Sequence, residues 1–234
     1  MEYDKIAILF FSALLGGGAV FIIQNNSQRK LKLLLSFSGA FLFAITILQL
    51  MPEVYAEARR FTGVFILAGF AFQILLEQFS GGIEHGHMHV HDKTPAFPYA
   101  IMISLCLHAF MEAMPLQDHA HTGLLWGIAL HHIPAAFVLG SILLQHRLKR
   151  TPVILLLVLF AAMSPAGMLF GHALADNSLG YISLYADYVM AAVIGIFLHI
   201  STTILFESSE DHRFNFYKSI AILLGAGFAL LGAL

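Results

Sequence analysis

The sequence predicts an all-α, polytopic membrane protein, with eight transmembrane helices in one domain that covers residues 1–234. Hydrophobic residues make up 59% of the 234 positions and charged residues only 11%, and the mean hydropathy is +0.80. Ordinary soluble domains carry roughly a quarter charged residues. Because a backbone exposed to lipid must satisfy its own hydrogen bonds, each membrane span is expected to be a helix.

Eight apolar stretches define the expected spans. The first stretch is preceded by Glu2 and Asp4 instead of a basic segment, so we interpret it as a transmembrane helix and not as a cleaved leader. Short loops separate the stretches and leave no room for a soluble domain. The spans are expected at about residues 4–24, 33–51, 62–80, 97–117, 121–146, 151–173, 184–207 and 215–234.

Basic residues fall unevenly on the two sides of these spans. If the chain starts outside, nine lie on the inner side and three on the outer side, so the positive-inside rule favours both termini outside a cell membrane, or an inner membrane in a Gram-negative cell. The loop 81–96 is then cytoplasmic. The inner residues are Arg29, Lys30, Lys32, Lys93, Arg147, Lys149, Arg150, Arg213 and Lys218, and the outer ones are Lys5, Arg59 and Arg60.

Helices 2 and 7 share a short stretch of similar sequence, which we call the internal echo. The run Gly39-Ala-Phe-Leu42 aligns with Gly195-Ile-Phe-Leu198, and Thr46 then falls opposite Thr202. Because the two helices cross the membrane in opposite directions, the echo indicates an inverted repeat of the kind found in many transporters. Glycine and phenylalanine are abundant here, so a chance match is the alternative.

The helix 4 and helix 5 pair carries the most unusual residues, which are His108, Glu112, His131 and His132. A polar turn separates the two helices, so they run antiparallel. His108 lies 12 residues before Ala120 at the centre of the turn and His131 lies 11 after it. At about 1.5 Å per residue, both lie roughly 17 Å deep, near the middle of the bilayer. His108 and Glu112 are spaced i, i+4 and therefore share a helix face.

These four residues predict a metal site. A charged residue in the middle of a span costs about 2.5–3.5 kcal/mol on insertion scales, so Glu112 is expected to have a function and a partner. Histidine is the commonest protein ligand for divalent transition metals. The alternative for a single histidine is a neutral ring that is hydrogen-bonded inside the bundle, but four such residues at one depth favour metal coordination.

Further candidates lie nearer the membrane surfaces. The loop after helix 3 alternates histidine with a spacer, at His85, His87, His89 and His91, and we interpret it as a weak metal buffer at the inner exit. Ordinary solvation at helix ends and turns is the alternative for the remaining residues. The entrance candidates are Glu53, Asp118, His119 and His121, and the exit candidates are His199 and Glu207.

Together these motifs resemble the ZIP (Zrt/Irt-like) family of divalent metal transporters. The resemblance covers the eight-span plan, the histidine-rich loop, the H-A-F-M-E run of helix 4, the H-H-I-P run of helix 5 and the L-Q-L-M-P-E end of helix 2. The family typically has H-N-x-x-E/D-G and H-E-I-P-E/H-G/E, which build a binuclear site. The resemblance implies that His108, Glu112 and His131 are ligands and places His132 where a carboxylate is usual.

The departures from the family pattern fall at the site itself. Ala109 stands where the family has asparagine, Ala135 where it has glutamate or histidine, and Ser164 at a helix 6 position that often holds an acid. We therefore expect one bound ion, held by His108, Glu112, His131 and in some geometries His132. Such a site suits Zn²⁺ and also Fe²⁺, Co²⁺, Ni²⁺ or Cu²⁺.

The sequence thus predicts a transporter that moves a divalent metal, zinc first, toward the cytoplasm by alternating access. The metal is its substrate, no enzyme cofactor or nucleic-acid partner is expected, and a homodimer is one option. Family members are thought to move the helix 4 and 5 bundle against a more static wall. Close sliding contacts would be permitted by small residues such as Gly16, Gly17, Gly18, Gly39, Gly63 and Gly69. The alternatives are a non-transporting metal sensor on the same plan and, less favoured since no H-E-x-x-H occurs, an intramembrane metalloenzyme.

Overall fold

The computed structural model describes residues 3–23, 28–56, 60–82, 99–117, 122–146, 148–176, 178–207 and 216–233. Within these ranges every regular element is helical, and six helical segments are long and apolar enough to cross a membrane. This confirms the expected all-α, polytopic membrane protein. The helices are α1 (Tyr3–Ala19), α2 (Gln28–Ile45), α3 (Met51–Ala56), α4 (Thr62–Ser80), α5 (Tyr99–Glu112), α6 (Thr122–Gln145), α7 (Arg150–Ala175), α8 (Ala186–Glu207) and α9 (Phe216–Ala233).

The second span is one continuous segment made of three helical pieces. A π-helical turn, η1 (Thr46–Leu50), joins α2 to α3, and the Met51 N–H bonds to the Thr46 carbonyl. The apolar segment therefore reaches Ala56, five residues beyond its expected end at residue 51. Pro52, the second residue of α3, has no N–H to donate, which fits a local change of hydrogen-bonding pattern.

Two other helices end several residues earlier than expected, and α2 begins at Gln28, five residues before its expected start at residue 33. α1 ends at Ala19 instead of residue 24 and is followed by turns, because glycines 16–18 make its last helical turn weak. α5 ends at Glu112 and is followed by the 3₁₀ turn η3 (Met114–Gln117), which contains Pro115. Proline cannot continue an α-helix, so the tighter turn begins there.

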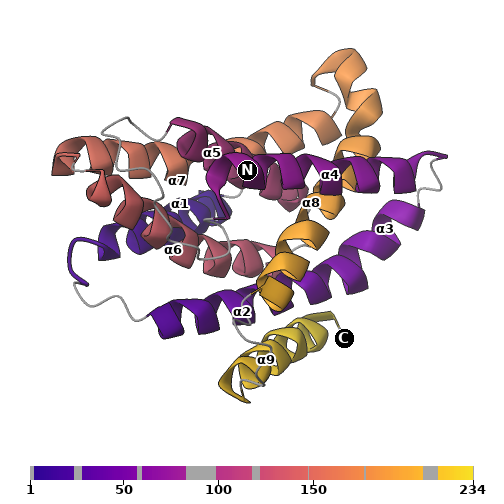
Figure 1. Ribbon diagram of the computed structural model, residues 1–234. Coiled ribbons are helices and arrows are strands. Elements are labelled where there is room, and N and C mark those ends of the chain that lie inside the picture. The colour runs from indigo at the N-terminus through magenta and orange to yellow at the C-terminus, as the bar shows by residue number, and fades with distance from the viewer. Residues whose placement is uncertain are drawn as a thin grey trace.

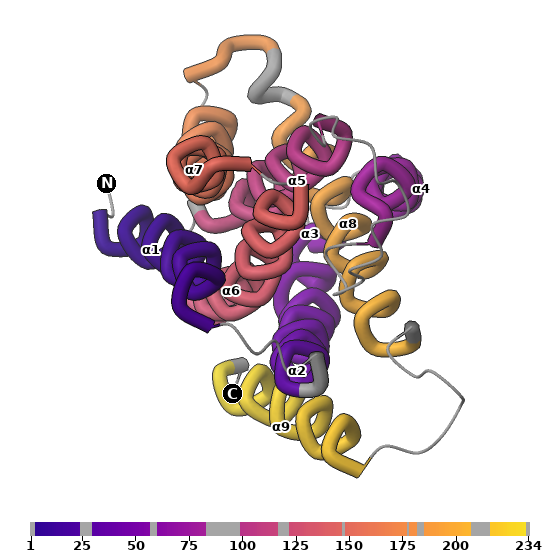
Figure 2. The backbone as a smooth tube through the Cα atoms, turned by 60° about the vertical axis from the view of Figure 1, so that its left-hand side comes forward, coloured from indigo at the N-terminus to yellow at the C-terminus, as the bar shows by residue number. Residues whose placement is uncertain are grey.

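The helices form two groups, which contact each other mainly through α2 with α6 and α4 with α5. In the first, α1 packs against α6 and α7, and α5 packs against α7; in the second, α4 packs against α8, and α2 packs against α9. Figure 1 and Figure 2 show α9 beside α2 at one edge of the molecule and α1, α6 and α7 gathered on another side. α5 and α6 contact each other far less closely than α5 contacts α7 or α6 contacts α1, which leaves space between them for side chains.

Glycines make the closest backbone contacts, and these contacts lie within the groups. A Cβ built on Gly16 would lie 2.2 Å from the carbonyl oxygen of Ile133, so α1 and α6 touch backbone to backbone. Gly16 packs on α6, one of the two helices expected to move, whereas Gly69 packs on α8. Gly39 likewise packs on α8, against Ile204. The sliding contact itself stays a prediction. The other backbone contacts of this kind are Gly167 on Phe110, Gly69 on Ala192, Gly195 on Ile66 and Gly225 on Phe37.

The helix pairing supports the inverted repeat, which stays a prediction. If α2 corresponds to α8, the α2 and α9 pair corresponds to the α8 and α4 pair, and both pairs are closely packed. Thr46 donates a hydrogen bond of 2.8 Å to the Leu42 carbonyl, and Thr202 donates one of 2.6 Å to the Leu198 carbonyl. The aligned residues therefore make the same local contact.

Candidate metal site

Helix α5 brings His108 and Glu112 to one buried face, one helical turn apart. His108 is 1% exposed and Glu112 is fully buried. The His108 Nε2 atom lies 3.4 Å from the Glu112 Oε1 atom, as the i, i+4 spacing predicts. Ser104, one turn before His108, is also buried, so a polar stripe follows this face of the helix.

Helix α6 supplies two more buried histidines, His131 and His132, which are fully inaccessible to solvent. α6 has the largest buried share of the candidate spans, so its side chains are shielded from lipid on most sides. It runs through Pro134 without a break in helical assignment. The ring centroids of His108 and His131 are 5.9 Å apart, which shows that the two helices direct these side chains at each other.

Three of the four predicted residues converge tightly. His108, Glu112 and His131 each offer one ligand atom, and these atoms all lie within 4.8 Å of one another. Both ring nitrogens of each of these two histidines, and Glu112 Oε1, have no hydrogen-bond partner. Buried polar atoms are normally paired, because leaving one unpaired costs about 1–3 kcal/mol. Two imidazole nitrogens and a carboxylate oxygen are a donor set that suits a first-row transition metal.

His132 stands apart from this group of three. Its Nε2 atom lies 2.9 Å from Glu112 Oε2, the second oxygen of the carboxylate. Its Nδ1 atom lies 3.2 Å from the Ser164 hydroxyl on α7, and the Phe160 ring packs against the imidazole. Both nitrogens therefore have partners, and the carboxylate is held by one oxygen while the other faces His108 and His131.

The remaining predicted residues lie elsewhere or outside the described ranges. His199 is 8% exposed and pairs with Glu77 of α4, so it does not belong to the group of three. Glu53 is exposed in the first turn of α3. Glu207 is the last residue of α8, and nothing of its side chain is described. His85, His87, His89, His91, Asp118, His119 and His121 lie outside the described residues.

Sequence reasoning missed Glu77 and Gln73 of α4. Glu77 lies one turn before the end of its helix, where a carboxylate is usually solvated, and Gln73 carries no charge. Their i, i+4 spacing inside an apolar span was the available signal. In the structure Gln73 is fully buried.

Comparison with known proteins agrees with this arrangement. The family model described as ZIP Zinc transporter matches residues 91–233, which include α5 to α9 and all four buried His and Glu residues. The chain belongs to the ZIP family. Similar proteins include Zinc transporter ZIP1 of Mus musculus (29% identical, over 93% of this chain and 82% of the relative) and of Homo sapiens (29%, over 89% and 79%). Zinc transporter ZIP9-B of Xenopus laevis is 24% identical over 86% of this chain and 84% of its own length.

These ZIP relatives bear the names of transporters and not of enzymes, in agreement with the expected class. Ala109, Ala135 and Ser164, the departures from the family pattern, are all buried. Ser164 is the one of them with a described polar contact to the His and Glu residues, through His132. The ZIP framework is thus combined with a histidine-rich interior.

Proposed function

We propose that this ZIP-family protein transports a divalent transition metal, zinc first, toward the cytoplasm, and that His108, Glu112 and His131 bind the ion near the middle of the membrane. The observation that carries the proposal is the convergence of these three buried side chains with unpartnered ligand atoms. Two neutral imidazoles and one carboxylate bring a single negative charge to a dication. The ion keeps a net positive charge in the site, which favours exchange over permanent retention.

In this proposal His132 is a positioning residue. It holds Glu112 Oε2 at 2.9 Å and is itself held by Ser164 at 3.2 Å. The partners of a metal ligand fix its orientation and typically change metal affinity by about 10–100-fold. The chain from Ser164 through His132 to Glu112 therefore directs Oε1 toward the ion.

The site is proposed to hold one ion. Ala135 lies one helical turn beyond His131, and Ala109 directly follows His108; both are buried and offer no ligand atom. Ser164 offers a hydroxyl, but it is hydrogen-bonded to His132. A second ion at this position would lack the carboxylates that a dication needs in an apolar surrounding.

Alternating access is proposed to come from movement of the first helix group against the second. The closest backbone contacts lie inside each group, as with Gly16 on Ile133. Across the groups, Gly127 of α6 packs on the side chains of Leu42 and Phe41, and the Ser104 hydroxyl donates a 2.7 Å hydrogen bond to the Leu76 carbonyl. Side chains change rotamer more readily than two touching backbones separate, so the boundary between the groups is the weaker interface.

The experiment is metal uptake into liposomes that contain the purified protein. Zn²⁺, Fe²⁺, Co²⁺ and Ni²⁺ are offered outside, and the luminal metal is measured against protein-free vesicles. Uptake of zinc supports transport, and the order of rates gives the ion preference. Metal binding without uptake of any ion would contradict transport and favour the sensor, the alternative that Ala109 and Ala135 make relevant.

A further inference from the structure

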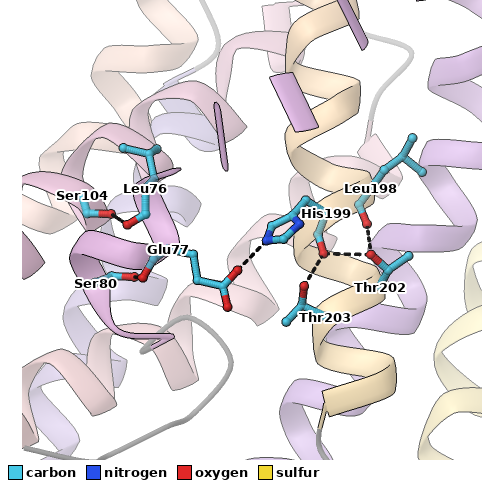
Figure 3. Close-up of polar contacts among 8 residues, drawn as sticks. All are labelled: Leu76, Glu77, Ser80, Ser104, Leu198, His199, Thr202 and Thr203. Atoms are coloured by element: carbon cyan, nitrogen blue, oxygen red, sulfur yellow. Dashed lines mark hydrogen bonds and ion pairs between the residues drawn. The ribbon is translucent and has the colours of Figure 1, made fainter. Parts of the chain in front are cut away.

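A second polar cluster lies between α4 and α8. The His199 Nε2 atom is 2.5 Å from the Glu77 Oε2 atom, and both side chains are largely buried, at 10% and 20% exposure. Figure 3 shows Glu77 reaching from α4 toward the His199 ring of α8. An imidazole and a carboxylate that meet inside the bundle are the same pair of ligand types as in the group of three.

Gln73 adds an unsatisfied amide to this cluster. It lies one turn before Glu77 and one turn after Gly69, and both of these residues contact α8. Gln73 therefore faces α8 as well, and its side chain is fully buried. Its Oε1 and Nε2 atoms have no hydrogen-bond partner. An amide oxygen binds zinc more weakly than an imidazole or a carboxylate does, so Gln73 can add to a site that His199 and Glu77 form.

Packing between α4 and α8 does not require the cluster of Gln73, Glu77 and His199. Gly69 and Gly195 already bring the two helices into backbone contact at the Ala192 and Ile66 carbonyls. Ionisable residues within spans are costly and normally serve a site or a path. The pair of Glu77 and His199, with Gln73 beside it, therefore fits a binding site better than a contact that only holds the two helices together.

The cluster adjoins the helix that carries the first site. Ser104 of α5 donates its hydrogen bond to the carbonyl of Leu76, the residue before Glu77. Ser104, His108 and Glu112 follow one another at one-turn intervals along α5. Through this hydrogen bond, Ser104 links the α5 face that carries the group of three to the last two turns of α4. α4 ends at Ser80, just before the histidine-rich loop.

We propose that Gln73, Glu77 and His199 form a second binding site for a divalent transition metal, on the α4 and α8 wall, that receives the ion between the first site and the α4 C-terminal end. The role of this second site in transport rests on the proposed function. Metal binding at the site does not depend on transport. The ion replaces the hydrogen bond between His199 and Glu77, whose ligand atoms move apart to about 3.3 Å, as tetrahedral zinc requires.

The test is zinc binding by the full chain in lipid nanodiscs, measured by titration calorimetry. The background protein carries His108→Ala and His131→Ala, which remove the first site, and alanine at His85, His87, His89 and His91. It is expected to bind one Zn²⁺ per chain. Adding Glu77→Gln or His199→Ala is expected to weaken this binding by about 10–100-fold or more, whereas Gln73→Leu weakens it less.

Thr203→Val is the matched control, since Thr203 lies one turn from His199 and only donates to its carbonyl, at 2.9 Å. Glu77→Gln can keep a hydrogen bond to His199, and an unchanged thermal midpoint in detergent verifies that the fold is intact. A background protein that binds no zinc, or whose binding ignores Glu77→Gln and His199→Ala, would overturn the proposal. Uptake by the wild type is measured separately, so the second site stands or falls independently of transport.

Discussion

The two oxygens of Glu112 have different surroundings. Oε2 is held by His132, while Oε1 faces His108 and has no hydrogen-bond partner. A carboxylate fixed at one oxygen presents the other in a defined direction, which lowers the cost of ordering it around an ion. In the proposed site, Ser164 and His132 therefore matter without touching the metal.

Substitutions of His132 and Ser164 should weaken zinc binding to different degrees. His132→Ala removes the partner of Oε2 and is expected to lower affinity by about 10–100-fold. Ser164→Ala removes one hydrogen bond, worth about 0.5–1.5 kcal/mol, so a loss of only a few-fold is expected. Titration calorimetry on the full chain compares the two, and equal losses, or none for His132→Ala, would count against the positioning role.

The sequence predicted which side chains converge better than it predicted which of them bind the ion and which position a ligand. Depth and i, i+4 spacing were sufficient to bring His108, Glu112 and His131 together, because a helix has a fixed rise and period. The roles of His131 and His132 could not be separated, since adjacent residues differ by about 100° and either can face the partner helix. In the structure His132 is the one that contacts the second carboxylate oxygen, and Ser164 on α7 contacts its other ring nitrogen.

Helix pairs are held by glycines at specific positions. The Gly16 contact with Ile133 joins α1 to the part of α6 that carries His131 and His132. Two residues further along α1, Gly18 has no atom within 4 Å of the place where a Cβ would stand. The same residue type on the same helix therefore has opposite steric surroundings.

Gly16→Ala should destabilise the protein, whereas Gly18→Ala should not. The added methyl group at position 16 overlaps the Ile133 carbonyl, and overpacking of this kind costs about 1–3 kcal/mol. At position 18 alanine meets no neighbour and favours the helix. Thermal unfolding in detergent provides the comparison, and a midpoint for Gly16→Ala at or above that of Gly18→Ala would refute the packing argument.

The sequence predicted the helices themselves but not the partner of each glycine. Apolar length defines a span, so α4 has the predicted bounds. Glycine or proline alters the ends of α1 and α5, whereas α2 begins five residues early because its first turn is the polar run Gln28-Arg-Lys. A glycine in a span indicates close approach but does not name the partner helix. That information is long-range, so the contacts of Gly16 with Ile133 and of Gly69 with Ala192 could not be predicted from the sequence.

The whole molecule consists of two helix groups, and each contains one of the two proposed sites. The first site lies on α5 and α6 of one group, and the second lies on α4 and α8 of the other. Movement of one group against the other would change the distance between the sites. The side of the membrane that the α4 C-terminal end faces then decides whether the second site lies on the entry or the exit side of the first.

Orientation is tested with single cysteines, because Cys106 is the one natural cysteine. In a Cys106→Ala background, Arg60→Cys and Lys149→Cys place exposed thiols at opposite ends of the bundle. With both termini outside, a membrane-impermeant maleimide added to sealed right-side-out vesicles should label position 60 and not position 149. Labelling of position 149 alone would reverse the predicted orientation.

Zinc uptake into liposomes by single histidine variants tests most directly whether His108, Glu112 and His131 bind the transported ion. His108→Ala and His131→Ala each remove one ligand of the group of three, and uptake is expected to fall by about 100-fold or more, above the losses typical of supporting residues. His172→Ala, at an exposed histidine on α7, serves as the control and should retain the wild-type rate. If either His108→Ala or His131→Ala takes up zinc at the wild-type rate, the proposed ion site is contradicted.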